Sequence, residues 1–178
     1  MQRSENNRRV GEEIAERALA ARGLPIPLDE AKRRRWQDEF NAHQGMQYIG
    51  CRLDLADPRV VRVHLPRIQP HHLGGLGTDA VNGALLAGFF DIALGVAGVL
   101  QYPGQRAGTV DLSIKFMRPT LGSSVTAYAV ALKRAENIAF VESELYSGSR
   151  LCAIASGMVA RTADGSNGND DGQDGRSG

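Results

Sequence analysis

A single acidic side chain, Asp91, interrupts the most apolar stretch of this 178-residue chain. Every other position from 83 to 100 is apolar or glycine. Burying an ionised carboxylate without partners is strongly unfavourable, so such a residue rarely lacks a role. Asp91 is therefore the first candidate for proton-transfer or nucleophilic chemistry. The alternative is a structural carboxylate that an internal hydrogen-bond network holds.

The residues around Asp91 have helical periodicity, and residues 81–100 are expected to form a long helix. Bulky side chains form two rows along this helix, whereas the row of Asp91 is otherwise small: Ala84, Gly88, Gly95 and Gly98. Glycine weakens a helix by roughly 1 kcal/mol relative to alanine, so these glycines need a reason. We expect them to clear space beside Asp91 for a strand, a partner helix or a ligand. A helix that is apolar on all sides is also expected to be enclosed by the rest of the chain.

Two other interpretations of this region are weaker. A membrane span needs roughly 20 apolar residues, but a central Asp and the absence of flanking basic or aromatic anchors oppose it. The segment Gly75-Leu-Gly77-Thr-Asp-Ala80 fits a dinucleotide-binding pattern, which requires a strand directly upstream. Pro66, Pro70 and the His71-His72 pair stand there instead, so this match is weak.

The composition excludes several function classes. The formal net charge of +1 gives no strong field toward nucleic acid or anionic lipid. Cys51 and Cys152 are the only cysteines, and the sequence lacks the Cys or His spacing of a zinc site. Two cysteines also argue against a disulfide framework. The charged N-terminus lacks the apolar segment of a signal peptide. We expect a cytoplasmic protein with no metal, no tightly bound cofactor, and no nucleic-acid or membrane partner.

The pattern divides the chain into three parts. Residues 1–44 predict a helical extension, with one short helix before residue 23 and a second over 28–41. Residues 45–162 form the expected domain. Residues 163–178 contain nothing to bury and are expected to be disordered.

Within the domain, alternating patterns predict a hairpin, a loop over 66–79, the long helix, and then four strands. The first strand after the helix is expected to place Val110, Leu112, Ile114 and Phe116 on one face. The fold class is thus α+β, with a long central helix wrapped by a curved antiparallel sheet of about five to six strands. An exposed sheet edge favours a dimer. The expected strands cover residues 46–55, 59–65, 109–116, 124–134, 138–146 and 151–161.

Three motifs in residues 45–161 resemble those of the hotdog-fold acyl-CoA thioesterases, the superfamily of the 4-hydroxybenzoyl-CoA and phenylacetate-pathway enzymes. The family begins its central helix with His-Gly-Gly and has an Asp or Glu nine residues after the His. Here Asn82-Gly83-Ala84 precedes Asp91 at that spacing. The next strand, Thr109-Val-Asp-Leu-Ser-Ile-Lys-Phe-Met-Arg-Pro119, resembles T-V-D-L-x-I-x-Y/F-x-R-P. The third motif is Ala155-Ser-Gly-Met-Val-Ala in the last strand.

The sequence departs from the family at three positions. Asn82 replaces the usual His, and Ala84 replaces the second Gly. Gly95 stands where several relatives carry a Ser or Thr.

The resemblance implies hydrolysis of an acyl-CoA or acyl-carrier thioester, with CoA only as part of the substrate. Asp91 would act as general base or as nucleophile. The Gly83 N–H at the helix N-terminus would polarise the carbonyl, and Asn82 would either donate its amide or cap the helix. Asp91 and Gly83 are separated by ~12 Å of helical rise, so two antiparallel helices of a homodimer would bring them together. The same resemblance implies further pairing of such dimers into a homotetramer.

The resemblance also adds candidates for substrate binding. The alternative is that these residues are ordinary loop or surface residues. Arg118, Arg106 and Lys115 are candidates for binding the phosphates of CoA. An apolar, glycine-lined pocket suits an aryl or medium acyl chain. Two rival functions stay open, a hotdog hydratase or dehydratase and a non-hydrolytic acyl-thioester-binding protein. The substrate-binding candidates are His72, Asp79, Gly88, Phe90, Gly95 and Arg118.

Overall fold

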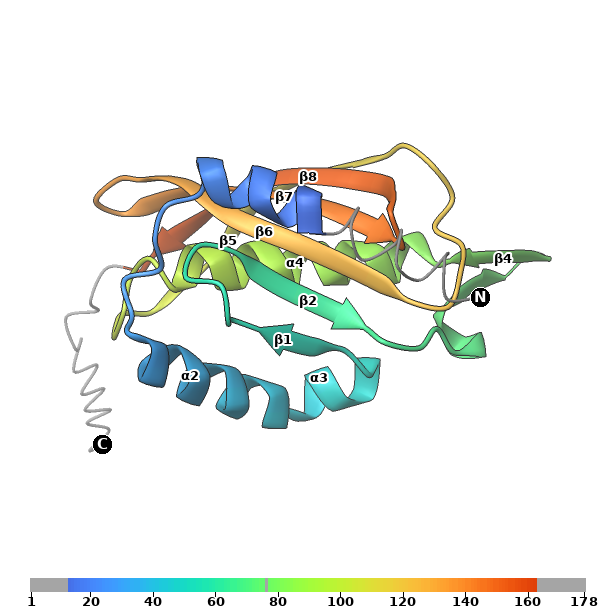
Figure 1. Cartoon of the computed structure of the whole chain (residues 1–178), viewed down its shortest axis with the longest axis horizontal. Coiled ribbons are helices and arrows are strands. Elements are labelled where there is room, and N and C mark those ends of the chain that lie inside the picture. The colour runs from blue at the N-terminus through green and yellow to red at the C-terminus, as the bar shows by residue number, and fades with distance from the viewer. Residues whose placement is uncertain (1–12, 76, 163–178) are drawn as a thin grey trace, which may run out of the picture.

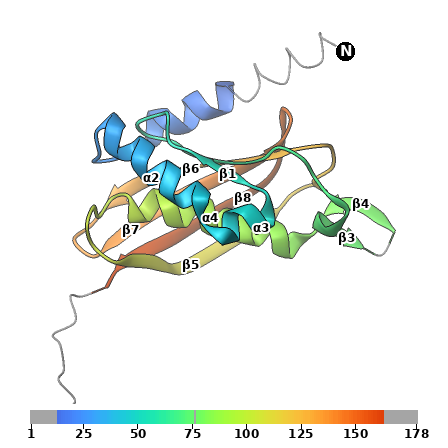
Figure 2. The ribbon, with the colours of Figure 1, turned by 90° about the horizontal axis from the view of Figure 1, so that it is seen from below.

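A six-stranded antiparallel sheet forms the body of the protein in a computed structural model that describes residues 13–75 and 77–162. The sheet curves around one long helix, α4 (Gly83–Val99), as Figures 1 and 2 show. The predicted helix and curved antiparallel sheet are thus confirmed. In spatial order the strands are β1 (Arg52–Asp54), β2 (Val61–Leu65), β6 (Val125–Arg134), β7 (Ile138–Ser147), β8 (Arg150–Arg161) and β5 (Ala107–Phe116).

The close packing of α4 on the sheet explains one of its glycines. A Cβ added at Gly98 would lie 2.4 Å from the Cβ of Val159 on β8, which no real pair of carbon atoms tolerates. Phe89, Phe90 and Leu94 are fully buried between α4 and the sheet. Gly98 therefore allows the helix to lie directly on the strand, as the sequence analysis expected of these small residues.

The rest of the chain does not enclose α4, contrary to the sequence-based expectation. Ala84 and Asp91 are exposed, and Gly88 and Gly95 are half-buried. A Cβ added at Gly88 would meet nothing within 4 Å. The sheet covers only one side of the helix, so the row formed by Ala84, Gly88, Asp91 and Gly95 stays open within one subunit. We call these four residues the open row.

Strand β5 is an edge of the sheet and pairs only with β8. Leu112 and Ile114 pack against the core, as predicted. Val110 is 63% exposed and does not share the predicted apolar face, whereas Phe116, although 53% exposed, lies beside Gly83 of α4. The pairing register shifts between Thr109 and Asp111, which breaks the alternation.

The N-terminal segment packs on the sheet instead of extending away from it. Residues 13–22 form a helix on the sheet face opposite α4 (Figure 1), where Leu19 is fully buried. Glu16 forms a 2.6 Å ion pair with Arg62 of β2. The following helix, α2 (Glu30–Ala42), is joined to β1 by hydrogen bonds between the Asn41 amide and the backbone of Leu53. The predicted disordered tail, residues 163–178, lies outside the described residues, as do residues 1–12.

The strand predicted over residues 46–55 is mostly wrong. Residues 44–49 form a short helix, α3 (Gln44–Ile49), and only β1 is extended. His43 caps α3 by accepting a hydrogen bond from the Gly45 N–H, and Gly50 ends it at φ 76°. A helix of six residues is too short to establish a helical period, so its pattern resembles alternation.

The segment predicted as a loop over residues 66–79 contains regular structure. It holds the 3-10 turn η1 (Pro70–His72) and a hairpin of β3 (Leu73–Gly75) and β4 (Thr78–Val81) that projects from the body (Figure 1). The strands are short and irregularly paired, and their glycines suggested a loop. No helix within residues 13–75 and 77–162 is long and apolar enough to cross a bilayer.

Candidate active site

A cavity of about 290 Å³ lies at the N-terminus of α4. The hairpin strand β4, the first turn of α4 and the segment that follows β5 surround it. The N–H of Val81 donates a 2.9 Å hydrogen bond to the carbonyl of Thr120, which ties β4 to that segment. The lining residues are Ala80, Val81, Gly83, Leu86, Phe116, Met117, Arg118, Pro119 and Thr120.

The first turn of α4 presents a free N–H donor to this cavity. The side-chain oxygen of Asn82 accepts a 2.8 Å hydrogen bond from the Ala84 N–H, so Asn82 caps the helix. No hydrogen bond in the described part of the chain uses the Gly83 N–H. An unpaired N–H at the positive end of a helix suits a carbonyl oxygen that gains negative charge. Gly83 therefore has the geometry that the sequence analysis expected of it.

Asp91 is exposed in the subunit, which corrects the expectation that it is buried. Its row faces away from the sheet, and none of residues 13–75 and 77–162 covers it. Asp91 is not among the cavity-lining residues, because it lies ~12 Å along the helix from Gly83. One subunit thus provides the N–H donor and the carboxylate at separate places on α4.

The other candidates on α4 have different surroundings. Gly88 and Gly95 belong to the open row with Asp91, and a Cβ added at Gly95 would lie 3.1 Å from Thr109 Oγ1. Phe90 is fully buried in the core against the sheet and does not line the cavity at the N-terminus of α4. The pocket that we expected beside Phe90 lies instead at the N-terminus of α4.

His72 supports the start of α4. Its carbonyl accepts a 2.8 Å hydrogen bond from the Asn82 N–H, and its Nδ1 accepts one of 2.9 Å from the Gln69 N–H. The ring is almost fully buried, and Nε2 makes no hydrogen bond of normal geometry with the described residues. Burial and the neighbouring His71 lower the pKa of His72. Asp79 and His71 are exposed on the same segment and do not line the cavity.

Arg118 is the charged residue of the cavity wall, as the sequence analysis expected of a substrate-binding residue. Its Nη1 donates a 2.8 Å hydrogen bond to the carbonyl of Leu151. Thr120, which the sequence analysis missed, is also in the wall, and its buried hydroxyl has no partner. A threonine after Arg-Pro carries no signal of its own, so only the structure identifies it.

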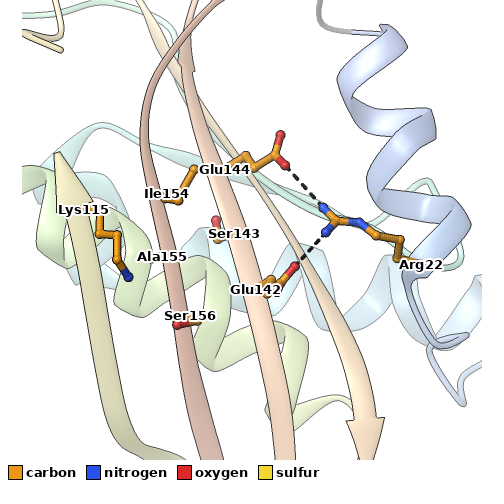
Figure 3. A pocket seen from close by; sticks show the side chains of 8 residues that line it. All are labelled: Arg22, Lys115, Glu142, Ser143, Glu144, Ile154, Ala155 and Ser156. Carbon is orange, nitrogen blue, oxygen red and sulfur yellow. Dashed lines mark hydrogen bonds and ion pairs between the residues drawn. The ribbon is translucent and has the colours of Figure 1, made fainter. Parts of the chain in front are cut away.

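A second cavity, of about 310 Å³, lies on the sheet face opposite α4 (Figure 3). In it Arg22 bonds to Glu142 at 2.9 Å and to Glu144 at 3.3 Å, across from Lys115. The Tyr146 hydroxyl donates a 2.6 Å hydrogen bond to Glu144, and burial raises the pKa of Tyr146. These contacts hold residues 13–22 to the sheet. Among the described residues, no three His, Cys, Asp or Glu side chains gather as a metal-ligating group.

Known proteins of similar structure agree on the fold. A Shewanella oneidensis protein related to the thioesterase superfamily matches with a TM-score of 0.69 and 16% identity, over 76% of this chain and 99% of that one. A thioesterase from Haemophilus influenzae matches with a TM-score of 0.65 and 14% identity, over 78% and 94%. The chain has the hotdog fold.

Two further comparisons show similarity to the thioesterase superfamily. Residues 79–154, from β4 into β8, match the family model of the thioesterase superfamily. The Escherichia coli PaaI protein from the phenylacetic acid degradation operon matches with a TM-score of 0.61 and 16% identity, over 73% of this chain and 92% of that one. No curated protein sequence gives a significant match. The resemblance to this superfamily that the sequence motifs indicated is confirmed.

Proposed function

We propose that this protein hydrolyses an acyl thioester as a homodimer, with Asp91 of one subunit beside the Gly83 N–H of the other. The family match supports thioester chemistry. The observation that carries the finer proposal is the open row of α4, which leaves Asp91 exposed on the helix that begins at the cavity.

The open row and the free edge of β5 favour a symmetric pair. Val110 on this edge strand is apolar and 63% exposed. An edge strand that pairs with its own copy satisfies its unpaired backbone groups. If the two α4 helices lie antiparallel across the same axis, each Asp91 approaches the N-terminus of the other helix.

The proposed reaction adds water across the thioester. The Gly83 N–H polarises the carbonyl and stabilises the oxyanion, which a low-dielectric site makes more effective. Asp91 either takes a proton from the attacking water or attacks the carbonyl itself. With water as the nucleophile, the C–S bond then breaks, the carboxylic acid is released, and the proton goes to the leaving thiolate. With Asp91 as the nucleophile, C–S cleavage releases the thiolate and leaves an anhydride on Asp91; water hydrolyses this anhydride to the carboxylic acid and restores Asp91, and a proton from the water goes to the thiolate.

The cavity size favours an aryl or medium acyl group. Its volume of about 290 Å³ is roughly twice that of a ~150 Å³ cavity that accommodates benzene. Its walls include Val81, Leu86, Phe116 and Pro119, which offer apolar surface to such a group. The E. coli relative from the phenylacetic acid degradation operon fits the same substrate class.

Release of free thiol from a panel of acyl-CoA thioesters tests this function. The wild type is expected to be active, and Asp91→Asn is expected to lose ~10²–10⁴-fold in kcat because the base or nucleophile is removed. Unchanged folding in Asp91→Asn, followed by circular dichroism, is the control. Full activity in that variant contradicts the role of Asp91.

Two substitutions at Gly83 distinguish the effect of losing the N–H donor from the effect of losing the glycine. Proline is favoured at the first position of a helix and lacks the N–H, so Gly83→Pro removes the donor with little harm to α4. The extended conformation of Asn82, at ψ 130°, suits the residue before proline. We expect a loss of ~10²–10³ in kcat for Gly83→Pro. Gly83→Ala keeps the N–H, and its Cβ would lie 3.9 Å from Phe116 Cζ, so most activity should remain.

The same assay distinguishes the alternatives. Saturable binding of acyl-CoA without thiol release indicates a non-hydrolytic binding protein. Conversion of an enoyl or hydroxyacyl thioester with the C–S bond intact indicates a hydratase or dehydratase.

A further inference from the structure

A third cavity, of about 190 Å³, lies between two loops at the same end of the molecule as the N-terminus of α4. One loop joins β5 to β6 and the other joins β7 to β8 (Figure 1). Its wall is rich in hydroxyl groups, which set it apart from the apolar cavity beside Gly83. The name serine pocket denotes six of the residues that line this cavity: Gly122, Ser123, Ser124, Ser147, Gly148 and Ser149.

The packing of the two loops leaves hydroxyl groups available. Gly122 has φ 117°, a conformation that favours glycine, and a Cβ there would lie 2.9 Å from Ser147 Oγ. The Ser147 hydroxyl is bonded to the carbonyl of Leu121 and so joins the loops. No hydrogen bond in the described part of the chain uses the hydroxyls of Ser123, Ser124 and Ser149. These three groups can therefore bind a ligand.

Three arginines belong to segments that adjoin the serine pocket. Arg150 follows Ser149 directly, and Arg118 Nη1 donates to the carbonyl of Leu151 in the same turn. Arg67 precedes Ile68, whose N–H bonds to the Ser123 carbonyl at 2.8 Å. Segments 66–72, 117–124 and 147–151 contain no Asp or Glu. The loops thus form a locally positive surface.

Free hydroxyls together with guanidinium groups are a recognition set for phosphate. Arginine binds phosphate through charge-assisted, often paired hydrogen bonds, and serine hydroxyls donate further ones. A volume of about 190 Å³ equals several water molecules at ~30 Å³ each, so it has room for a phosphate with the group it esterifies.

We propose that the serine pocket, with Arg118 and Arg150, binds a phosphate ester of the thiol carrier. The assignment of this phosphate ester to the thiol carrier rests on the proposed function. The segment after β5 lines both cavities, with Arg118 and Thr120 in the one beside Gly83 and Gly122 to Ser124 in the other. The two cavities thus suit the thioester end and the phosphate end of one substrate.

Calorimetric titration with two thioester-free probes tests this site independently of hydrolysis. The probes are adenosine 3′,5′-bisphosphate and 4′-phosphopantetheine. Arg150 is exposed and its side chain has no hydrogen bond or ion pair within the described residues, so Arg150→Gln removes the charge without breaking such a contact. We expect Arg150→Gln to bind the preferred probe at least about tenfold more weakly. The control is Lys133→Gln, an exposed cation near the end of β6 that is remote from the serine pocket, and it should bind as the wild type does.

The probe that binds identifies the source of the phosphate. Arg150-dependent binding of the bisphosphate supports the nucleotide end of CoA, and Arg150-dependent binding of 4′-phosphopantetheine alone supports the arm of a carrier protein. Equal affinities in wild type and Arg150→Gln, or no binding of either probe, overturn the proposal. An inactive enzyme that still shows Arg150-dependent binding contradicts the hydrolase function and leaves this site standing.

Discussion

At the scale of residues, the sequence identifies Asp91 and Gly83 because of their types and spacing. An isolated acid in an apolar stretch and a glycine at a helix start are visible without coordinates. Their surroundings are not visible, because a helical period does not say which side the sheet covers. The exposure of Asp91 and the place of Phe90 in the core therefore emerge only from the structure. Thr120 and the role of His72 depend on tertiary contacts between distant segments.

The buried ring of His72 predicts a pH effect on stability. Burial and His71 lower the pKa of His72 in the folded chain below its ordinary value of 6.5. Between these two values the unfolded chain binds more protons, so stability present at pH 7 is lost as pH falls through 6.5 and the folded pKa. Protonation also removes the Nδ1 acceptor of the Gln69 N–H.

Urea denaturation of wild type and His72→Asn at pH 7 and pH 5 measures this effect. Asparagine offers an acceptor near the position of Nδ1 and does not titrate. We expect the loss of unfolding free energy on acidification to be smaller in the variant. An equal loss in both proteins contradicts the assigned role of His72. His64, whose pKa burial also lowers, should retain the rest of the pH dependence in both proteins.

At the scale of elements, long periodic segments are predictable and short ones are not. Helix α4 and strands β6, β7 and β8 agree with the expected ranges to within about two residues. Helix α3 and the β3–β4 hairpin are missed, because caps and pairing between short segments decide them. The register shift in β5 depends on its partner strand and has no signal in the alternation.

The contact between α4 and β8 predicts a specific double-mutant result. Gly98→Ala forces its new methyl group against Val159, and overpacking of this kind destabilises a core by ~1–3 kcal/mol. Val159→Ala removes the opposing methyl groups and makes room. We expect the free energy of unfolding of Gly98→Ala to recover in part when Val159→Ala is added, relative to the sum of the single effects. Strictly additive losses contradict the close approach.

At the scale of the whole molecule, the sheet carries different layers on its two faces. Helix α4 covers one face and leaves its open row for a partner. Residues 13–22 cover the other face and bury Val130 and Tyr128 beneath Leu19. The sequence predicts a helical extension, but only the structure shows that residues 13–22 belong to the packed body.

Truncating Leu19 tests whether this helix stabilises the sheet. Leu19 is fully buried, so Leu19→Ala should reduce the free energy of unfolding by ~2–5 kcal/mol. Ile14 on the same helix is 63% exposed, and Ile14→Ala should change it by less than ~0.5 kcal/mol. Similar small effects of both substitutions in thermal or urea unfolding indicate that the helix is not docked.

The edge of β5 provides the corresponding test of the dimer. Val110 is exposed in one subunit, so Val110→Lys should leave the folded subunit intact. If the edge pairs with its own copy, two opposed lysines repel each other and the dimer dissociates. We expect sedimentation velocity to show a shift toward monomer, with thiol release falling in parallel. A variant that stays in the wild-type oligomeric state contradicts pairing through β5.

Mixing two inactive variants tests the shared site most directly. Asp91→Asn and Gly83→Pro subunits are unfolded together, refolded as a mixture, and assayed for thiol release. A mixed dimer then holds one site with both Asp91 and the Gly83 N–H and one site with neither, so the mixture should regain about a quarter of the wild-type activity. If each site uses both groups from a single subunit, the mixture stays as inactive as its two components.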